Sequence, residues 1–236
     1  MRILITNDDG IASPVLPRLV KWAQELGEVT VVAPKTEQSG KSQSIDFSRA
    51  VEIKRYDLGV DCEAWAMDST PADCVRFGVL GLKRDYDLVL SGINRGFNLG
   101  DDISYSGTVG ATLEASRLGL RAIALSTDTK GFDVAMSELD GAYDYIVKNK
   151  LLSVATLLNV NFPNQKSRGI CITRQGGMFY SDEFVYQGND MYIQIGEPVC
   201  KGADLSVDID AVINGYISIT PLTAEKTDFP AMKKLK

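Results

Sequence analysis

The chain of 236 residues is 44% hydrophobic, has a formal net charge of −6 and contains no histidine. This composition predicts a globular protein with a buried core. The negative charge argues against binding of duplex nucleic acid, which requires basic residues that neutralise phosphates. Without histidine, a Ser-His-Asp triad, a phosphohistidine and imidazole-ligated metal sites are excluded, so the chemistry must use oxygen ligands.

The N-terminal sequence enters a strand-like run directly, without a signal peptide. No apolar stretch approaches the ~20 residues that are needed to cross a bilayer. We therefore expect a cytoplasmic protein with no membrane partner.

The first part of the chain alternates between strand and helix patterns. Residues 2–6 and 28–33 are short β-branched runs, typical of strands that are buried on both faces of a parallel sheet. Between them, Ser13 is the expected N-cap of a helix, with Pro14 at the first helical position. These segments predict a βαβ unit.

The same alternation continues beyond the first unit. Thr70 and Asp73 form a capping box, which predicts the start of a helix. The elements expected here are a helix over 70–82, a strand over 87–91, a helix from about Thr108 and a strand over 122–126. This order predicts a doubly wound α/β fold with a mostly parallel sheet, in which ligands bind at the carboxyl ends of the strands.

The last third of the chain is richer in strands. A helix over 133–149 is followed by expected strands over 157–162, 170–173, 179–187, 191–195 and 216–220. Gly188-Asn189-Asp190 predicts a hairpin turn. We divide the chain into a catalytic core, 1–150, and a β-rich part, 151–236. The hairpin in the second part, at about 179–195, is expected to serve oligomerisation before the chain returns to the core.

Asn7-Asp8-Asp9-Gly10 follows the first predicted strand directly. Asn, Asp and Gly are common turn residues, so an isolated segment of this kind is most simply a turn. However, two adjacent carboxylates repel each other, and holding both ionised at a strand end is costly unless a cation neutralises them. The position therefore favours a metal site.

Two further polar loops follow predicted strands at the same edge. Ser39-Gly40-Lys41-Ser42 lies in the polar segment 35–49, whose length and lack of periodicity indicate a functional loop. The segment 92–100 carries Asn94 and Asn98 between glycines. Carboxylate, hydroxyl and amide oxygens together suit Mg²⁺, Mn²⁺ or Ca²⁺ rather than zinc or copper.

The segment from Ser104 to Gly110 leads into the third predicted helix. Its hydroxyls and backbone N–H groups could bind an anion at the helix N terminus. Ser106 or Thr108 could equally serve only as a helix cap. Beside a metal loop, phosphate binding is the better interpretation.

Three familiar motifs are absent. Gly40-Lys41-Ser42 resembles the end of a P-loop, but Lys35 stands where the first glycine is required. A dinucleotide-binding G-x-G-x-x-G is not found after the first strand. Gly10 stands where a haloacid-dehalogenase-type phosphatase has its second aspartate, so an aspartyl-phosphate mechanism is not expected.

At these residues the sequence strongly resembles the SurE survival-protein family of metal-dependent 5′/3′-nucleotidases. The matching segments are RILITNDDGI (2–11), VVAP…SGKSQSI (31–45), STPADCV (69–75), SGINRGFNLGDDISYSGTVGATLEA (91–115) and GYISITPL (215–222). Two positions differ from the usual family pattern: Lys35 replaces Asp, and Ser69 replaces Gly. Neither is an expected ligand.

The resemblance implies a Rossmann-like core with a C-terminal extension that exchanges between subunits of a homodimer or homotetramer. It implies one divalent metal ion per subunit, Mg²⁺ or Mn²⁺. The implied metal ligands are Asp8, Asp9, Ser39 and Asn94. The residues implied to face the phosphate of a nucleoside monophosphate are Asn98, Ser104, Ser106, Gly107 and Thr108.

The expected reaction is hydrolysis of a nucleoside 5′- or 3′-monophosphate by a metal-activated water. Asp8 is the candidate to orient or deprotonate that water. Asn94, with the phosphate-facing residues, is expected to stabilise charge on the phosphoryl oxygens. Two alternatives are a nucleotide-sensing protein with little turnover and a hydrolase of another phosphoester, such as short polyphosphate.

Overall fold

The computed structural model describes residues 1–199 and 202–235. Within them, nine strands form one sheet in the order β3-β4-β2-β1-β5-β6-β7-β11-β8. The strands are β1 (Arg2–Thr6), β2 (Glu28–Pro34), β3 (Ile53–Arg55), β4 (Glu63–Met67), β5 (Leu88–Arg95), β6 (Ala122–Thr127), β7 (Leu157–Phe162), β8 (Ile170–Ile172) and β11 (Ile217–Leu222). The run from β4 to β7 is parallel, whereas β3 and β11 are antiparallel to the strands β4 and β7.

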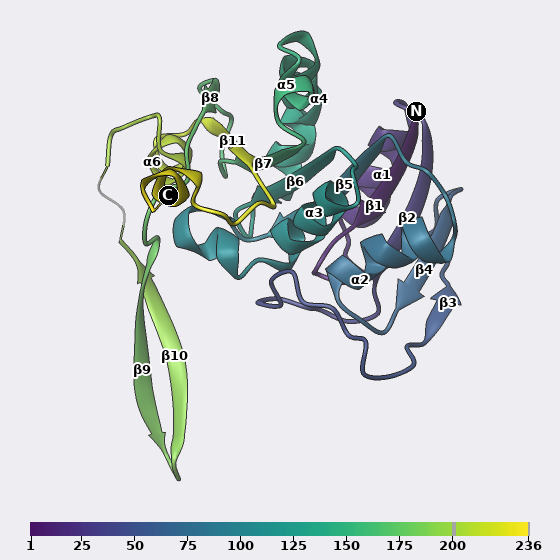
Figure 1. Cartoon of the computed structure of the whole chain (residues 1–236), viewed down its shortest axis with the longest axis horizontal. Helices are drawn as coiled ribbons and strands as arrows, with labels where there is room; N and C mark the ends of the chain where they lie inside the picture. The colour runs from purple at the N-terminus through teal and green to yellow at the C-terminus, as the bar shows by residue number, and fades with distance from the viewer. Residues whose placement is uncertain (200–201, 236) are drawn as a thin grey trace.

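Helices cover both faces of this sheet (Figure 1). The longer helices are α1 (Leu16–Gln24), α3 (Gly107–Arg117) and α4 (Phe132–Lys148), and the shorter ones are α2 (Pro71–Arg76), α5 (Leu151–Val154), α6 (Asp208–Ile213) and α7 (Phe229–Lys234). Side chains of α1 and α4 share a core with Ile3 and Ile5, whereas α2 and α3 pack with Leu4 on the other face. Because successive side chains of a strand point to opposite faces, β1 is buried on both. The doubly wound, mostly parallel α/β fold is thus confirmed.

The C-terminal third contributes to the same sheet. β7 pairs with β6, so the proposed division at residue 150 falls within one continuous sheet. The exception is the hairpin of β9 (Tyr180–Gly188) and β10 (Met191–Pro198), which projects from the body (Figure 1). Asn189 and Asp190 both have positive φ at its tip, as the predicted turn requires.

Some expected element boundaries were wrong. α1 begins at Leu16 with Val15 as its N-cap. The Ser13 backbone instead forms a turn with Gly10, its N–H donating to that carbonyl at 3.1 Å. Ser13 Oγ has no hydrogen-bond partner among the described residues, so it caps nothing.

The capping box before α2 is only half formed. Thr70 Oγ1 accepts the hydrogen bond of the Asp73 N–H, but the Asp73 carboxylate accepts from Ser69 Oγ at 2.6 Å and from the backbone N–H of Asp46 at 2.8 Å. Asp73 therefore ties the 35–49 loop to α2. Beyond α2 the backbone continues as a π-helical turn over Phe77–Gly81. The strands β3 and β4 were not predicted.

Candidate functional site at the switch point of the sheet

The carboxyl ends of β1 and β5 are the place where the strand order reverses. β1 lies between β2 and β5, and the chain fills the β2 side first and the β5 side later. In doubly wound sheets, ligands bind in the crevice at such a switch point. Asn7-Asp8-Asp9-Gly10 follows β1, and Asn94 lies near the end of β5, so both expected metal segments meet there.

The turn after β1 is built by its outer residues. Asn7 Oδ1 accepts from the Gly10 N–H at 3.1 Å, and Asn7 Nδ2 donates to the Gly10 carbonyl at 2.9 Å. Gly10 has a φ of +95°, which a residue with a side chain rarely adopts. Asn7 and Gly10 thus close the turn, and the two aspartates between them are not needed for it.

Asp8 is held against the N terminus of α3. Its carboxylate accepts from the Thr108 backbone N–H at 3.0 Å and from the Thr108 hydroxyl. The side chain is buried, and this burial raises the pKa of Asp8 although both hydrogen bonds from Thr108 favour the ionised form. Gly107 makes the approach possible, because a Cβ there would lie 3.0 Å from Asp8 Cβ and Oδ2.

Asp9 faces the end of β5. Its Oδ2 accepts from the backbone N–H of Arg95 at 3.3 Å. Burial, together with the negative charge of Asp8, raises the pKa of Asp9 to about 6. In the metal-free protein the two carboxyl groups therefore resist simultaneous ionisation, and a cation between them would remove that cost.

Asn94 reaches the same edge because β5 is irregular there. The register between β5 and β6 shifts between Ser91 and Asn94, and a Cβ on Gly92 would lie 2.2 Å from the Leu125 carbonyl oxygen. A bulge of this kind redirects the side chains that follow it. Asn94 Nδ2 donates to the Gly96 carbonyl at 2.9 Å, and this leaves Asn94 Oδ1 available to a cation.

The loop after β2 brings Ser39 near Asp8. The neighbouring Gln38 N–H donates to the Asp8 carbonyl at 2.7 Å. Ser39 is exposed, and its hydroxyl donates to Glu37 Oε1 at 2.7 Å, so its oxygen lone pairs stay available. Glu37 is a third acidic residue near the aspartates, which sequence reasoning did not single out. Its charge adds to the raised pKa of Asp9.

These residues suit a hard divalent cation. In the described part of the chain, no three His, Cys, Asp or Glu side chains lie close enough together to hold a metal. A cation at the switch point would therefore depend on the Asn94 amide and Ser39 hydroxyl oxygens as well as on Asp8 and Asp9. Such an all-oxygen set suits Mg²⁺ or Mn²⁺.

The start of α3 offers donors to an anion. Ser106 is the N-cap, and its Oγ accepts from the Val109 N–H at 3.0 Å. The Gly107 N–H has no hydrogen-bond partner among the described residues. The Thr108 donors, in contrast, are both directed at Asp8. Ser104 is exposed beside this turn, and its carbonyl accepts from Ser42 Oγ at 2.8 Å.

Asn98 is fixed by a polar network that the sequence did not reveal. Its backbone N–H donates to Asn161 Oδ1 at 2.9 Å, and its carbonyl accepts from the side-chain amides of Asn159 and Asn161. Asn98 Nδ2 donates to Ser126 Oγ at 2.8 Å. The two asparagines in the otherwise apolar run of β7 were the available signal, because a buried polar side chain needs a partner.

Asp208 holds the next part of this loop. One of its oxygens accepts from the Gly100 N–H at 2.9 Å, and the other accepts from the N–H groups of Gly176 and Ile209 at 2.8 Å. The side chain is completely buried. Asp208 thus joins the loop after β5 to α6.

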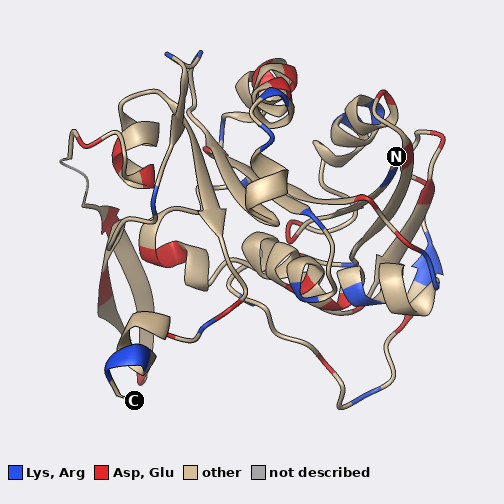
Figure 2. Cartoon of the chain, turned by 45° about the horizontal axis from the view of Figure 1, so that its top comes forward, with Lys and Arg blue, Asp and Glu red and all other residues tan. Residues whose placement is uncertain are grey.

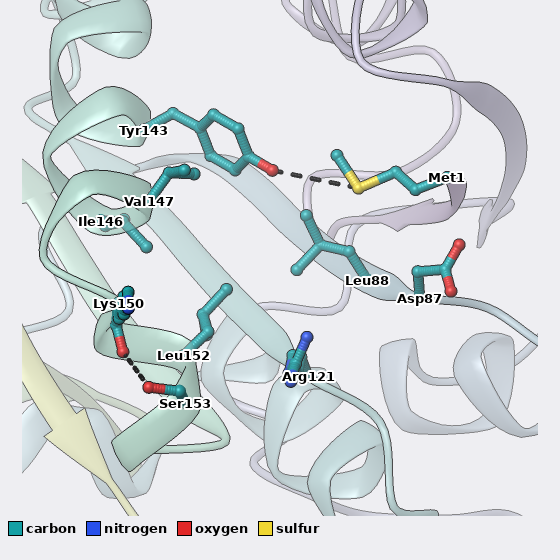
Figure 3. A pocket seen from close by; sticks show the side chains of 10 residues that line it. All are labelled: Met1, Asp87, Leu88, Arg121, Tyr143, Ile146, Val147, Lys150, Leu152 and Ser153. Carbon is teal, nitrogen blue, oxygen red and sulfur yellow. Dashed lines mark hydrogen bonds between the residues drawn. The ribbon is translucent and has the colours of Figure 1, made fainter.

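A separate cavity of about 260 Å³ lies at the opposite edge of the sheet (Figure 3). Met1, Asp87 and Arg121, which line it, immediately precede β1, β5 and β6. This is the amino edge of the parallel strands, away from the aspartates. The candidate site is therefore the carboxyl edge. Acidic and basic segments are interspersed around the molecule in the view of Figure 2, and no helix in the described residues is long and apolar enough to span a bilayer.

Fold and site together define a doubly wound α/β protein with paired carboxylates and a helix N terminus at its switch point. The family model described as Survival protein SurE matches residues 3–182. The chain therefore belongs to the SurE family, as its sequence segments indicated.

Individual relatives match over nearly the whole chain. The protein from Thermus thermophilus named 5′-nucleotidase SurE 1 is 40% identical, and the match covers 96% of this chain and 93% of that protein. The 5′-nucleotidase SurE of Clostridium beijerinckii is 37% identical over 97% of this chain and 95% of its own length. The crystal structure of the SurE protein from Aquifex aeolicus matches with a TM-score of 0.85 at 35% identity, covering 100% of this chain and 98% of that one.

Proposed function

We propose that this protein is a divalent-metal-dependent 5′-nucleotidase that hydrolyses nucleoside 5′- and 3′-monophosphates to nucleoside and phosphate. The observation that carries the proposal is the contact between Asp8 and the start of α3, which brings an acidic pair beside the unpartnered N–H of Gly107 in the described chain. A cation site adjoining an anion site is the arrangement that phosphoryl transfer requires. The curated relatives named 5′-nucleotidase support the substrate class.

The proposed metal ligands are Asp8, Asp9, Ser39 and Asn94, with one Mg²⁺ or Mn²⁺ per subunit. Their fit rests on the raised pKa of the two aspartates and on the free oxygen of Asn94. When bound, the ion supplies Lewis-acid activation of the phosphoryl group and of water.

The remaining steps belong to the side chains. Asp8 orients the attacking water and takes its proton. The Gly107 N–H, with Ser104, Ser106 and Thr108, binds the phosphoryl oxygens at the helix N terminus. For Thr108 this requires its two donors to be shared between Asp8 and the phosphate. Asn94 and Asn98 add amide groups on the β5 side.

The test is phosphate release from AMP, 3′-AMP, short polyphosphate and p-nitrophenyl phosphate, with Mg²⁺, with Mn²⁺ and after chelation. We expect metal-dependent release from the two nucleotides, and none from Asp8→Ala, which should stay folded. Nucleotide binding without turnover would instead support a sensor. Preference for polyphosphate would identify a different phosphoesterase.

Two further expectations stay predictions. Assembly into a homodimer or homotetramer through the β9–β10 hairpin is proposed from its exposed apolar side chains. The cytoplasmic location is proposed from the sequence, and duplex nucleic acid is not an expected partner.

A further inference from the structure

A cavity of about 560 Å³ adjoins Asp9 on the side away from α3. Its walls come from the segment before α1, the end of β5 and the connection from β6 to α4. The residues that matter for its chemistry are Asp9, Ser13, Arg95, Thr129 and Phe132. Because Asp9 forms part of the wall, a ligand whose phosphate lies at the aspartates could extend into this space.

Arg95 is the basic residue of this cavity, whose wall also includes the acidic residues Asp9 and Glu37. Its backbone N–H is bonded to Asp9, but its guanidinium has no hydrogen bond or ion pair with any residue that the structure describes. The guanidinium is nevertheless close enough for its charge to oppose the rise in the pKa of Asp9. An unpaired guanidinium beside a phosphoryl site is suited to binding a phosphate oxygen.

Another residue of the lining, Phe132, can contact a nucleoside. Phe132 is half-buried at the start of α4 and contributes an aromatic ring. A flat apolar surface suits a base.

We propose that this cavity receives the nucleoside of the substrate, with Phe132 packed against the base and Arg95 binding the phosphate. The inference rests on the proposed nucleotidase activity and adds two substrate-binding residues to it. It also places the nucleoside away from the 35–49 loop. Of that loop, Glu37 alone lines the cavity. Neither Arg95 nor Phe132 has side-chain contacts that read the edge of a base, so we expect broad base tolerance.

The competing location is the cavity of about 320 Å³ on the α3 side, lined by Ser42, Ser104, Ser106 and Lys226. Lys226 is exposed, and its ammonium group has no partner in the described chain, so Lys226→Ala is the charge-matched control for Arg95→Ala. Phe47 in the 35–49 loop is 89% exposed, so Phe47→Ala is the aromatic control. For Phe132 we choose Leu, which keeps most of the core packing but loses the flat ring.

The experiment combines adenosine binding by calorimetry in chelator with kcat and KM for AMP and for ribose 5-phosphate. Phe132→Leu should weaken adenosine binding and raise KM for AMP about tenfold, with ribose 5-phosphate unchanged. Arg95→Ala should lower kcat/KM for both AMP and ribose 5-phosphate by roughly ten- to a hundredfold, with adenosine binding unchanged. Arg95→Lys should recover part of the lost kcat/KM. Thermal unfolding of each variant shows whether the fold is kept.

The controls decide between the two cavities. The inference would be overturned if Phe132→Leu bound adenosine as tightly as the wild-type protein does, or if Phe47→Ala bound it more weakly. The proposed function would still stand in either case if the wild-type protein hydrolysed AMP. A larger loss in Lys226→Ala than in Arg95→Ala would overturn the role of Arg95. Failure of the wild-type protein both to hydrolyse AMP and to bind adenosine would overturn inference and function together.

Discussion

Gly107 shows how one residue without a side chain controls the site. It lets the start of α3 touch Asp8, since a Cβ would lie 3.0 Å from Asp8 Oδ2 and 3.1 Å from the Gln38 carbonyl oxygen. A helix N terminus has no intrinsic need for glycine. The requirement comes instead from Asp8, which follows β1, and from the Gln38 backbone.

We predict that Gly107→Ala lowers kcat/KM for AMP by about tenfold or more, because a small displacement of a catalytic carboxylate is costly. Stability should change by less than about 1 kcal/mol, since alanine is tolerated in the first helical turn. Gly141→Ala in α4 is the matched control, because its new Cβ meets nothing within 4 Å. Equal activities of the two variants would contradict the proposed contact.

The aspartate pair also predicts a pH dependence of stability. The folded-state pKa of Asp9 is about 6, above the ordinary value of 3.8. Between these values the folded protein binds more protons than the unfolded chain, so the contribution of Asp9 to stability falls as pH rises from about 4 to about 6.

In chelator, Asp9→Asn should therefore gain stability relative to the wild type as pH rises. The gain should be small near pH 5 and about 2–6 °C in Tm near pH 8, after allowance for solvent screening. In saturating Mg²⁺ at the higher pH, the wild type should instead have the higher Tm, because only the wild type keeps both carboxylates. Scanning calorimetry at each pH measures this, and a pH-independent difference would argue against carboxylate repulsion.

At the level of elements, Asp208 is the link between the loop after β5 and α6. It is a completely buried carboxylate that accepts three backbone hydrogen bonds. A carboxylate can accept all three, whereas an asparagine at the same position would direct an NH₂ group at one of these donors.

Asp208→Asn should destabilise the protein by about 1–3 kcal/mol through this unsatisfied group. It should also lower kcat for AMP, because Gly100 ends the segment 94–100, which carries Asn94 and Asn98. Hydrogen exchange should accelerate in residues 98–104. Asp204→Asn, at an exposed position near α6, should have smaller effects on all three measurements, and comparable effects would show that the link has no special role.

For the whole molecule, the β9–β10 hairpin is the feature that a single chain does not explain. Its exposed apolar side chains include Phe184, Tyr186, Met191, Tyr192, Ile193 and Ile195. An isolated two-stranded hairpin is marginally stable in water, so association with another subunit would account for these side chains. Phe179 at its base is different, because it packs with Leu99 in a small core cluster.

We predict that the intact chain is a dimer or tetramer by light scattering, and that a shortened hairpin yields monomers. Asp182 and Gly196 are paired in register, so an Asn-Gly turn joining them removes the arm and preserves Phe179. Double replacement of Phe184 and Ile193 by Glu should have the same effect with the backbone intact. A monomeric wild type at micromolar concentration would contradict the prediction.

Most of the sheet could be predicted because its signals are local. Buried β-branched runs at β1, β2, β5, β6 and β7 alternate with helical periodicity, and right-handed crossovers then order them. β3 and β4 were not predicted, because their short segments follow a long polar loop. α1 starts late because the Ser13 backbone is used in a turn, which propensity does not detect.

The sequence by itself also predicted where the site lies and which chemistry it would support. Polar segments after β1 and β5 must meet at the switch point, and a chain without histidine is left with oxygen ligands. Three features were visible only in the tertiary structure. Both donors of Thr108 bond to Asp8, and the side-chain amides of Asn159 and Asn161 donate to the Asn98 carbonyl. Arg95 borders an open cavity. These contacts join residues up to 100 positions apart, and nothing in the local pattern at either end specifies its partner.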